Sequence, residues 1–241
     1  SPSIKTSDIA ARLKAAYPGI VTAVTDNLVT FADGTTLPLD DGKEKPTLQT
    51  WLDTPDIADM FAKPYPWGAP LAPPAVDFDP GRARNADFFV KVYGNCHNGE
   101  VARDLVTVVW LPRKFNRHIR VTRRNRAAEA FAAVSRELDA LPSAFDTYLA
   151  QFGGTYVCRP IAGTRHTSAH AYGIAIDIAP KKAAYWRWTA DGKMRPYSNA
   201  MPTEIIAIFE KHGFIWGGRW YHYDTMHFEY RPELSPAPGL H

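Results

Sequence analysis

The stretch TSAHAYGIAID, residues 167–177, carries one histidine and one aspartate seven positions apart, with a glycine and small apolar residues between them. A helix is disfavoured, because Gly173 is a poor helix former and β-branched isoleucines follow it at alternate positions. One straight strand would place His170 and Asp177 on opposite faces of a sheet. We therefore predict a loop that carries His170, a turn near Gly173, and a strand over residues 174–178.

The predicted strand has two different faces. Its isoleucines point one way, into a core, whereas Ala175 and Asp177 point the other way. Since alanine leaves open space beside the aspartate, the preceding loop can bring His170 into that space. A metal ion fits between two such side chains.

A second polar cluster lies in WYHYDTMHFEY, residues 220–230. Its acids and histidines are His222, Asp224, His227 and Glu229. A strand at the end of this stretch would place His227 and Glu229 on one face. A catalytic zinc site needs three protein ligands and an open fourth position for water. If the two strands lie side by side, His170, Asp177 and His227 meet that requirement.

Asp224 precedes His227 by three residues, near the entry of the predicted strand. From there it can reach the water at the metal without being a ligand, which is the place of a general base. Each cluster alone has an ordinary explanation, since a lone histidine is usually a surface or core residue and an aspartate at a strand end often caps a turn. Two clusters with apolar residues on their opposite faces favour a site.

Length and composition are those of a globular protein: 241 residues, 45% hydrophobic and 22% charged. The net charge of +3 indicates no nucleic-acid partner. No apolar run approaches the roughly 20 residues of a transmembrane helix. The opening residues, SPSIKTSDIAARL, contain no apolar signal segment, so we expect any export signal to have been removed or never to have been present.

Six prolines between Pro64 and Pro80 interrupt regular structure and predict a boundary. We expect residues 1–80 to form an N-terminal extension of β-hairpins and short helices with a proline-rich connection. Residues 81–234 then form the domain that holds both clusters, and residues 235–241 form a tail.

Helices and strands are mixed irregularly in the second region. Apolar periodicity predicts helices in GRARNADFFVKVYG, RAAEAFAAVSRELDALP and PTEIIAIFEKHG, and strands in LVTVVWLP, HIRVT and GTYVCR. This order favours an α+β fold over a doubly wound parallel one. We expect an antiparallel sheet to carry the metal site, with helices flanking it.

The two clusters resemble the motifs of the zinc peptidases that cut bacterial cell-wall peptides. That group includes D-alanyl-D-alanine carboxypeptidases and L-alanyl-D-glutamate endopeptidases, with lysostaphin and the hedgehog signalling domain as more distant relatives that share the metal site. The pattern Ser-x-His-x-x-Gly-x-Ala-x-Asp is matched at residues 168–177. Asp-x-x-His-Phe, preceded by Trp-Gly-Gly, is matched within residues 216–228. The resemblance runs from about residue 155 to residue 230 and leaves residues 1–125 uncovered.

The resemblance implies Zn²⁺ as the cofactor and three ligands for it: His170, Asp177 and His227. It implies Asp224 as the general base. It also implies an arginine on a strand just before the histidine loop, which stabilises the oxyanion or holds a substrate carboxylate. Arg159, at the end of GTYVCR, matches that position, and Arg165 in the loop is the alternative. We prefer Arg159, because a strand end is a fixed platform for a preorganised donor.

Aromatic residues near the second cluster are candidates for the walls of a substrate groove: Tyr185, Trp186, Trp188, Trp216, Trp220 and Tyr221. We assign Trp216, Trp220 and Tyr221 to substrate binding, together with Ser168 of the first motif. Many carboxypeptidases of the group have a glutamate where this chain has Asp224. The aspartate resembles the endopeptidase branch and leaves open which bond is cleaved.

These features predict a secreted or periplasmic zinc peptidase that hydrolyses amide bonds in peptidoglycan stem peptides by a metal-activated water. It is either a carboxypeptidase or an L-Ala-D-Glu type endopeptidase. The alternative is a zinc-containing module that binds the wall without cleaving it, but such a module has no need for the base that Asp224 supplies.

The segment RKFNRHIRVTRRNR, residues 113–126, has seven lysines and arginines and no acid. Alternation of apolar with basic residues favours the solvated face of a hairpin. The functional alternative is contact with an anionic wall polymer.

Cys96 and Cys158 are too few for a four-cysteine zinc site. In an oxidising compartment they can form one bridge, which would join the loop after DFFVKVYG to the segment of Arg159. Two buried thiols are the alternative.

Overall fold

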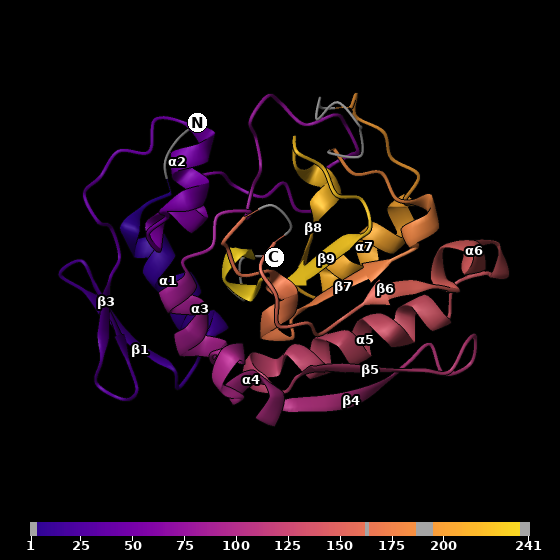
Figure 1. Cartoon of the computed structure of the whole chain (residues 1–241), viewed down its shortest axis with the longest axis horizontal. Helices are drawn as coiled ribbons and strands as arrows, with labels where there is room; N and C mark the ends of the chain where they lie inside the picture. Colours follow the sequence, from indigo (N-terminus) through magenta and orange to yellow (C-terminus); the bar gives the residue numbers. More distant parts are fainter. Residues whose placement is uncertain (1–3, 162–163, 187–194, 237–241) are drawn as a thin grey trace.

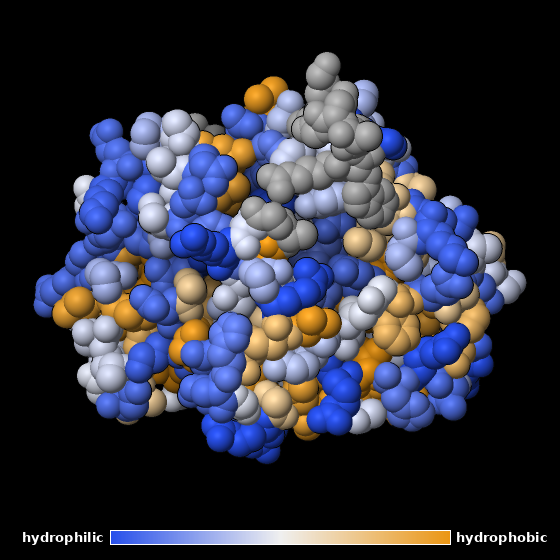
Figure 2. Space-filling view, in the orientation of Figure 1, coloured by the Kyte–Doolittle hydropathy of each residue, from blue (hydrophilic) through white to orange (hydrophobic). Residues whose placement is uncertain are grey.

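The computed structural model describes residues 4–161, 164–186 and 195–236, and Figure 1 shows their arrangement. The strands of this part form three antiparallel sheets, of three, two and four strands. Helices pack beside them without a regular β-α-β order, which confirms the predicted α+β class. On the face seen in Figure 2, hydrophobic residues gather only in small separate areas.

The N-terminal region forms a helix, a three-stranded meander and two short helical segments. Their bounds are α1 (Thr6–Ala16), β1 (Val21–Thr25), β2 (Leu28–Phe31), β3 (Thr36–Pro38), α2 (Leu48–Asp53) and η1 (Ala58–Phe61). Asp26 and Asn27 form the turn between β1 and β2 with φ of 51° and 61°, the left-handed conformation that a tight hairpin needs. The predicted hairpins are therefore present. Residues 64–80 contain no helix or strand, as their prolines predict.

The four-stranded sheet has the order β6-β7-β9-β8. Its strands are β6 (Phe152–Gly154), β7 (Ala175–Ile178), β9 (His227–Tyr230) and β8 (Phe214–Trp216). The antiparallel pairing of β7 with β9 sets Asp177 directly opposite His227, and Ala175 opposite Glu229. The two sequence clusters therefore lie side by side, as predicted.

The predicted strand GTYVCR, residues 154–159, is not formed. β6 ends at Gly154, and an irregular connection follows as far as Arg159. The register already shifts between Phe152 and Gly154, and Gly154 has a φ of 137°, so the chain leaves the sheet at this point. Arg159 consequently lies on a loop, and the fixed strand platform expected for it does not exist.

Aromatic side chains pack the central sheet against two helices, α5 (Ala127–Asp139) and α7 (Thr203–Lys211). The rings of Phe209 and Phe228 stack with centroids 3.9 Å apart, and Phe131 meets Phe214 edge to face at 4.8 Å. The isoleucines of β7 are buried in the same core, as predicted. Figure 1 shows α5 between this sheet and the hairpin of β4 (Leu105–Trp110) and β5 (Arg117–Thr122).

Three further helices complete this part of the fold. They are α3 (Ala86–Tyr93), α4 (Glu100–Arg103) and α6 (Asp146–Leu149). Within the described ranges, no helix has both the length and the hydrophobicity that crossing a membrane requires.

The N-terminal region packs against the segment that follows β9. The Arg12 guanidinium donates to the carbonyl of Leu234 at 3.1 Å, and the Trp67 indole donates to the same carbonyl at 3.0 Å. The Tyr17 hydroxyl donates to the buried carboxylate of Glu233. The boundary near residue 80 stays a prediction, and the contacts across it are buried and polar.

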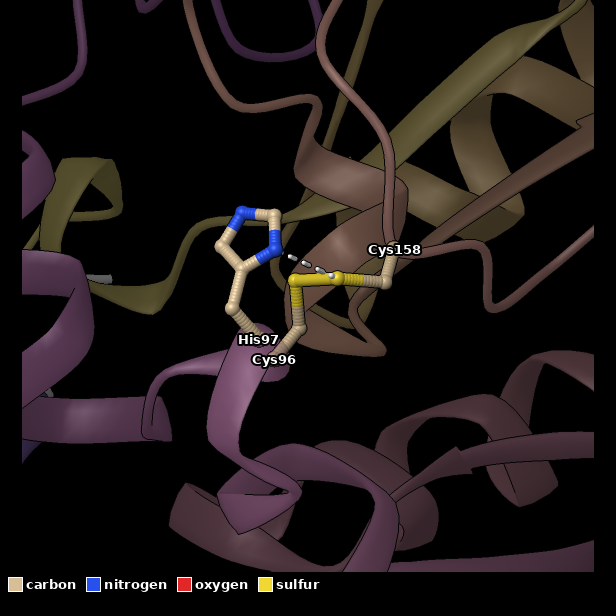
Figure 3. A group of neighbouring side chains, drawn as sticks. All are labelled: Cys96, His97 and Cys158. Atoms are coloured by element: carbon tan, nitrogen blue, oxygen red, sulfur yellow. Dashed lines mark hydrogen bonds between the residues drawn. A yellow bond between two sulfur atoms is a disulfide. The ribbon is translucent and has the colours of Figure 1, made fainter.

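Cys96 and Cys158 form a disulfide, shown in Figure 3, with their Cα atoms 5.7 Å apart. Cys96 begins the short helical turn η2 (Cys96–Asn98) after α3, and Cys158 lies one residue before Arg159. The expected bridge is thus present. It anchors the irregular connection that carries Arg159 to the helical part of the domain.

We expect a double Cys96→Ser and Cys158→Ser variant to lose up to about 4 kcal/mol of unfolding free energy, because the bridge closes a loop of 62 residues in the unfolded chain. Urea unfolding of the oxidised protein and of the variant measures the difference. Adding a reductant should lower the stability of the wild type and leave the variant unchanged. Equal stability of the oxidised wild type and the variant would contradict the bridge.

Candidate active site

A short helical turn, η5 (Ala169–Tyr172), brings His170 into contact with Asp177 of β7. Ser168 caps this turn by accepting a hydrogen bond from the His170 N–H. The turn ends at Gly173, whose φ is 72°, and a Cβ there would lie 3.0 Å from the Thr122 backbone nitrogen. Only glycine fits both conditions, which explains its place in the motif.

His170, Asp177 and His227 converge on one point. The Nε2 atom of His170 lies 3.2 Å from one oxygen of Asp177, and Nδ1 of His227 lies 3.1 Å from the other. One donor atom from each of the three residues lies within 4.8 Å of the other two. Two imidazole nitrogens and a carboxylate form a donor set that zinc prefers.

Each histidine ring is oriented by a hydrogen bond from its other nitrogen. Nδ1 of His170 lies 2.7 Å from the carbonyl oxygen of Thr155, so it carries the proton and leaves Nε2 as the electron-pair donor. Nε2 of His227 lies 2.9 Å from Glu229, which leaves Nδ1 as the donor. Such partners fix the tautomer and orientation of metal-binding histidines.

Glu229 is the centre of a buried charge network behind His227. Its carboxylate receives a two-pronged contact from Arg84 and lies 3.2 Å from an Nη1 nitrogen of Arg231. Arg231 in turn pairs with Glu233, which accepts from Tyr17. Sequence reasoning placed Glu229 beside His227 but gave it no role. The His-x-Glu spacing on one strand was the available signal.

We expect Glu229→Gln to weaken zinc binding roughly 10- to 100-fold, the usual effect of losing the partner of a metal-binding histidine. Competition with a chromogenic chelator measures the affinity. Glu129→Gln, at an exposed position, is the matched control. Wild-type affinity in a folded Glu229→Gln protein would show that this carboxylate does not tune the site.

The electrostatic environment of the three candidate ligands favours the binding of a cation. Burial alone would lower the pKa of His227, but the carboxylates of Asp177 and Glu229 raise that pKa to about 10. Burial would raise the pKa of Asp177, yet hydrogen bonds from His170 and His227 hold it well below its usual range. Without a metal, the His227 ring is therefore protonated. Its positive charge lies beside the carboxylates of Asp177 and Glu229, where a bound cation would also be stabilised.

Asp224 lies in the same pocket and is half-buried, with its Oδ1 atom enclosed by protein. Burial raises its pKa to about 6, and the nearby Asp177 carboxylate adds to this rise while His227 opposes it. Among the described residues, none donates a hydrogen bond to its Oδ1 atom. An acid with one enclosed oxygen, unpaired within the described part of the chain and beside the three candidate ligands, is suited to accept a proton.

The Trp-Gly-Gly motif shapes the backbone around Asp224. The Asp224 N–H donates to the carbonyl of Gly217 at 3.0 Å, and a Cβ on Gly217 would lie only 2.5 Å from the Asp224 carbonyl oxygen. A Cβ on Gly218 would overlap the Trp216 ring at 2.1 Å. A side chain at Gly217 would displace Asp224, and a side chain at Gly218 would displace the Trp216 ring.

The pocket around these residues has a volume of about 190 Å³. Two of the predicted substrate residues, Ser168 and Trp220, line it, and so does Arg159. Arg82, which sequence reasoning missed, also lines it. Its guanidinium lies over the Trp220 ring at 4.7 Å. Arg165 lines a neighbouring cavity instead.

Trp216 and Tyr221 do not line this pocket; the expectation for Trp216 is wrong, and that for Tyr221 stays a prediction. Trp216 is completely buried, and its ring stacks on Phe228 while its indole donates to the Thr225 carbonyl at 2.9 Å. It is a core residue because β8 directs it away from the site. Tyr221 packs edge to face on His222. Trp188 lies outside the described residues.

The antiparallel strands β7 and β9 place the three candidate ligands together at one pocket. Residues 162–230 match the family described as D-alanyl-D-alanine carboxypeptidase. The match contains all three candidate ligands and Asp224, and it confirms the resemblance seen in the motifs. It supports a peptidase of the kind that acts on peptidoglycan. The search of curated proteins and the search of solved structures found no match.

Proposed function

We propose that the protein is a zinc-dependent peptidase that hydrolyses amide bonds in peptidoglycan stem peptides. The observation that carries this proposal is the convergence of His170, Asp177 and His227 beside the half-buried Asp224 in one pocket. The family match over residues 162–230 supports the substrate class.

His170 through Nε2, Asp177 through its carboxylate and His227 through Nδ1 would hold the zinc. When bound, the metal supplies a Lewis acid that polarises a carbonyl and makes a water molecule more acidic. The three residues leave room for such a fourth partner, since they border the pocket instead of closing around a point in the core.

Asp224 acts as the general base in this proposal. It accepts the proton of the attacking water on its available oxygen and passes it to the leaving amine. Its burial supports the role, because a raised pKa makes the carboxylate a better base than an exposed aspartate.

Arg159 and Arg82 supply positive charge on the same pocket. Arg159 stabilises the oxyanion or holds a carboxylate of the substrate, and the disulfide one residue away steadies its loop. Arg82 is held by the backbone carbonyl of His222 and by Asp79 at 3.5 Å. A fixed cation of this kind costs no reorganisation during the reaction.

The motif with Asp224 in place of glutamate favours endopeptidase over carboxypeptidase action. The disulfide supports a secreted or periplasmic location, because such bonds persist in oxidising compartments. A non-catalytic wall-binding module is the alternative, and the Asp224 carboxylate oxygen beside the candidate ligands, unpaired among the described residues, argues against it. Digesting purified peptidoglycan and identifying the fragments by mass spectrometry tests the proposal and identifies the bond. Intact peptidoglycan after digestion with zinc-loaded protein would reject it.

The basic segment 113–126 is in part neutralised within the protein. Lys114 pairs with Asp146, and Arg123 and Arg124 both pair with Asp104. Arg117 and Arg120 are exposed on β5. The internal pairs support a solvated hairpin face over a surface for an anionic wall polymer.

A further inference from the structure

A second cavity adjoins the pocket of the candidate site. Its volume is about 340 Å³, larger than the 190 Å³ of the site pocket. Four residues, Arg82, Arg84, Ile161 and Tyr185, line both. The two cavities are therefore neighbouring compartments along one shared wall, and the larger one has the size of a small-ligand site.

The walls of the larger cavity come from both regions of the chain. Leu48, Gln49 and Leu52 of α2 form one side, and the loop before His170 contributes Arg165 and other residues. His166 in that loop lies 2.8 Å from the carboxylate of Asp53, the last residue of α2. This contact ties a wall inside the matched segment, residues 162–230, to a wall in the N-terminal region outside it.

The cavity presents a positive charge. Among the described residues that line it, the acid is Asp79, whose side chain is completely buried. Asp79 accepts from the backbone N–H of His222 at 3.1 Å and from its ring at 3.0 Å, and it pairs with Arg82. The negative charge of Asp79 is thus balanced by His222 and Arg82 within the cavity wall. Arg165, by contrast, is exposed.

We propose that this cavity binds the part of the substrate that extends beyond the scissile amide, and that Arg165 selects an extension bearing a carboxylate. The proposal rests on the peptidase function proposed above. It gives α2 of the N-terminal region a role in substrate choice.

The shape and the lining residues of the larger cavity both suit a peptide segment that carries a carboxylate. The guanidinium group of arginine matches a carboxylate with two parallel hydrogen bonds. Leu48 and Leu52 offer apolar surface for the aliphatic part of such a segment. Arg82 and Tyr185 line both compartments. A substrate peptide bound in the large cavity therefore continues directly into the site pocket.

The test uses five synthetic peptides that share the scissile bond identified in the peptidoglycan digest. One contains only the two residues that flank this bond. The other four carry the same extension on one or the other side of the bond, and on each side the extension ends either in a side-chain carboxylate or in the corresponding amide. We expect the wild type to cleave the acid form at least about tenfold more efficiently than the amide, judged by kcat/KM.

Arg165→Ala should abolish this preference and leave the short peptide cleaved within about twofold of the wild-type rate. Arg117→Ala is the matched control, because Arg117 is an exposed arginine of β5 that is distant from Arg165 in the sequence. This variant should keep the preference. Leu52→Trp should reduce cleavage of both extended peptides, by filling the cavity, and spare the short one. Leu28→Trp, at an exposed position of the meander, is its control.

The outcomes separate this inference from the proposed function. If the wild type cleaves the short peptide but shows no preference for the acid, or if Arg165→Ala keeps that preference, the cavity is not a carboxylate subsite and the peptidase proposal stands. If the zinc-loaded wild type cleaves neither the short peptide nor the extended ones, the peptidase proposal itself fails and this inference falls with it.

Discussion

Zinc content and activity should be lost together when His170, Asp177 or His227 is replaced by alanine. Each residue supplies one of the three donor atoms that lie within 4.8 Å of one another, and two remaining donors hold zinc far more weakly than three. We expect less than about one tenth of the wild-type zinc after dialysis against a mild chelator, and activity reduced by at least about 10³-fold, since the metal supplies both the Lewis acid and the acidified water. Elemental analysis and peptidoglycan digestion measure the two quantities.

His118→Ala is the matched control for the histidines, because His118 is exposed on β5 and distant from the cluster in the sequence. It should keep both zinc and activity. Removal of zinc from the wild type by a strong chelator should abolish activity, and added zinc should restore it. Full zinc occupancy and turnover in any one of the three variants would remove that residue from the site.

Asp224→Ala should separate binding of the metal from catalysis. Because Asp224 lies beside the ligand cluster without belonging to it, zinc content should equal that of the wild type. Activity should fall by roughly 10²-fold or more, the usual effect of losing a general base. The fold should persist, since burial raises the pKa of this group and its charged form is costly in the folded protein.

Asp224→Asn keeps the shape of the side chain and should lose as much activity as the alanine variant. Circular dichroism and zinc analysis confirm that both variants are folded and loaded. Loss of zinc in both would make Asp224 a ligand. Wild-type turnover in both would favour a module that binds the wall without cleaving it.

The sequence predicts the centre of the site well because strand alternation is a strict geometric rule. His227 and Glu229 had to share a face, and the isoleucines beside Asp177 could only point into a core. The pairing of the two strands was a condition of the predicted site, and the structure shows that pairing. The turn at Gly173 was also predictable from local sequence, because glycine is a poor helix former and β-branched isoleucines follow it at alternate positions.

The surroundings of the site could not be predicted in this way, because they depend on contacts between distant segments. Arg84 reaches Glu229 across 145 positions, and no local pattern indicates that contact. The irregular connection before Arg159 looks like a strand in composition, but the shift in register at Gly154 ends the pairing. Trp216 looked like a groove aromatic, and only the packing of β8 against Phe228 places it in the core.

The hydrogen bond from Tyr17 to Glu233 joins residues 216 positions apart, and through Arg231 and Glu229 it reaches His227. During synthesis, the segment after β9 therefore has to emerge before the ring of His227 acquires its buried support. A chain that is still growing on the ribosome holds both sequence clusters without this bracing. The support of the His227 ring is complete only when the helix that carries Tyr17 and the segment after β9 have come together.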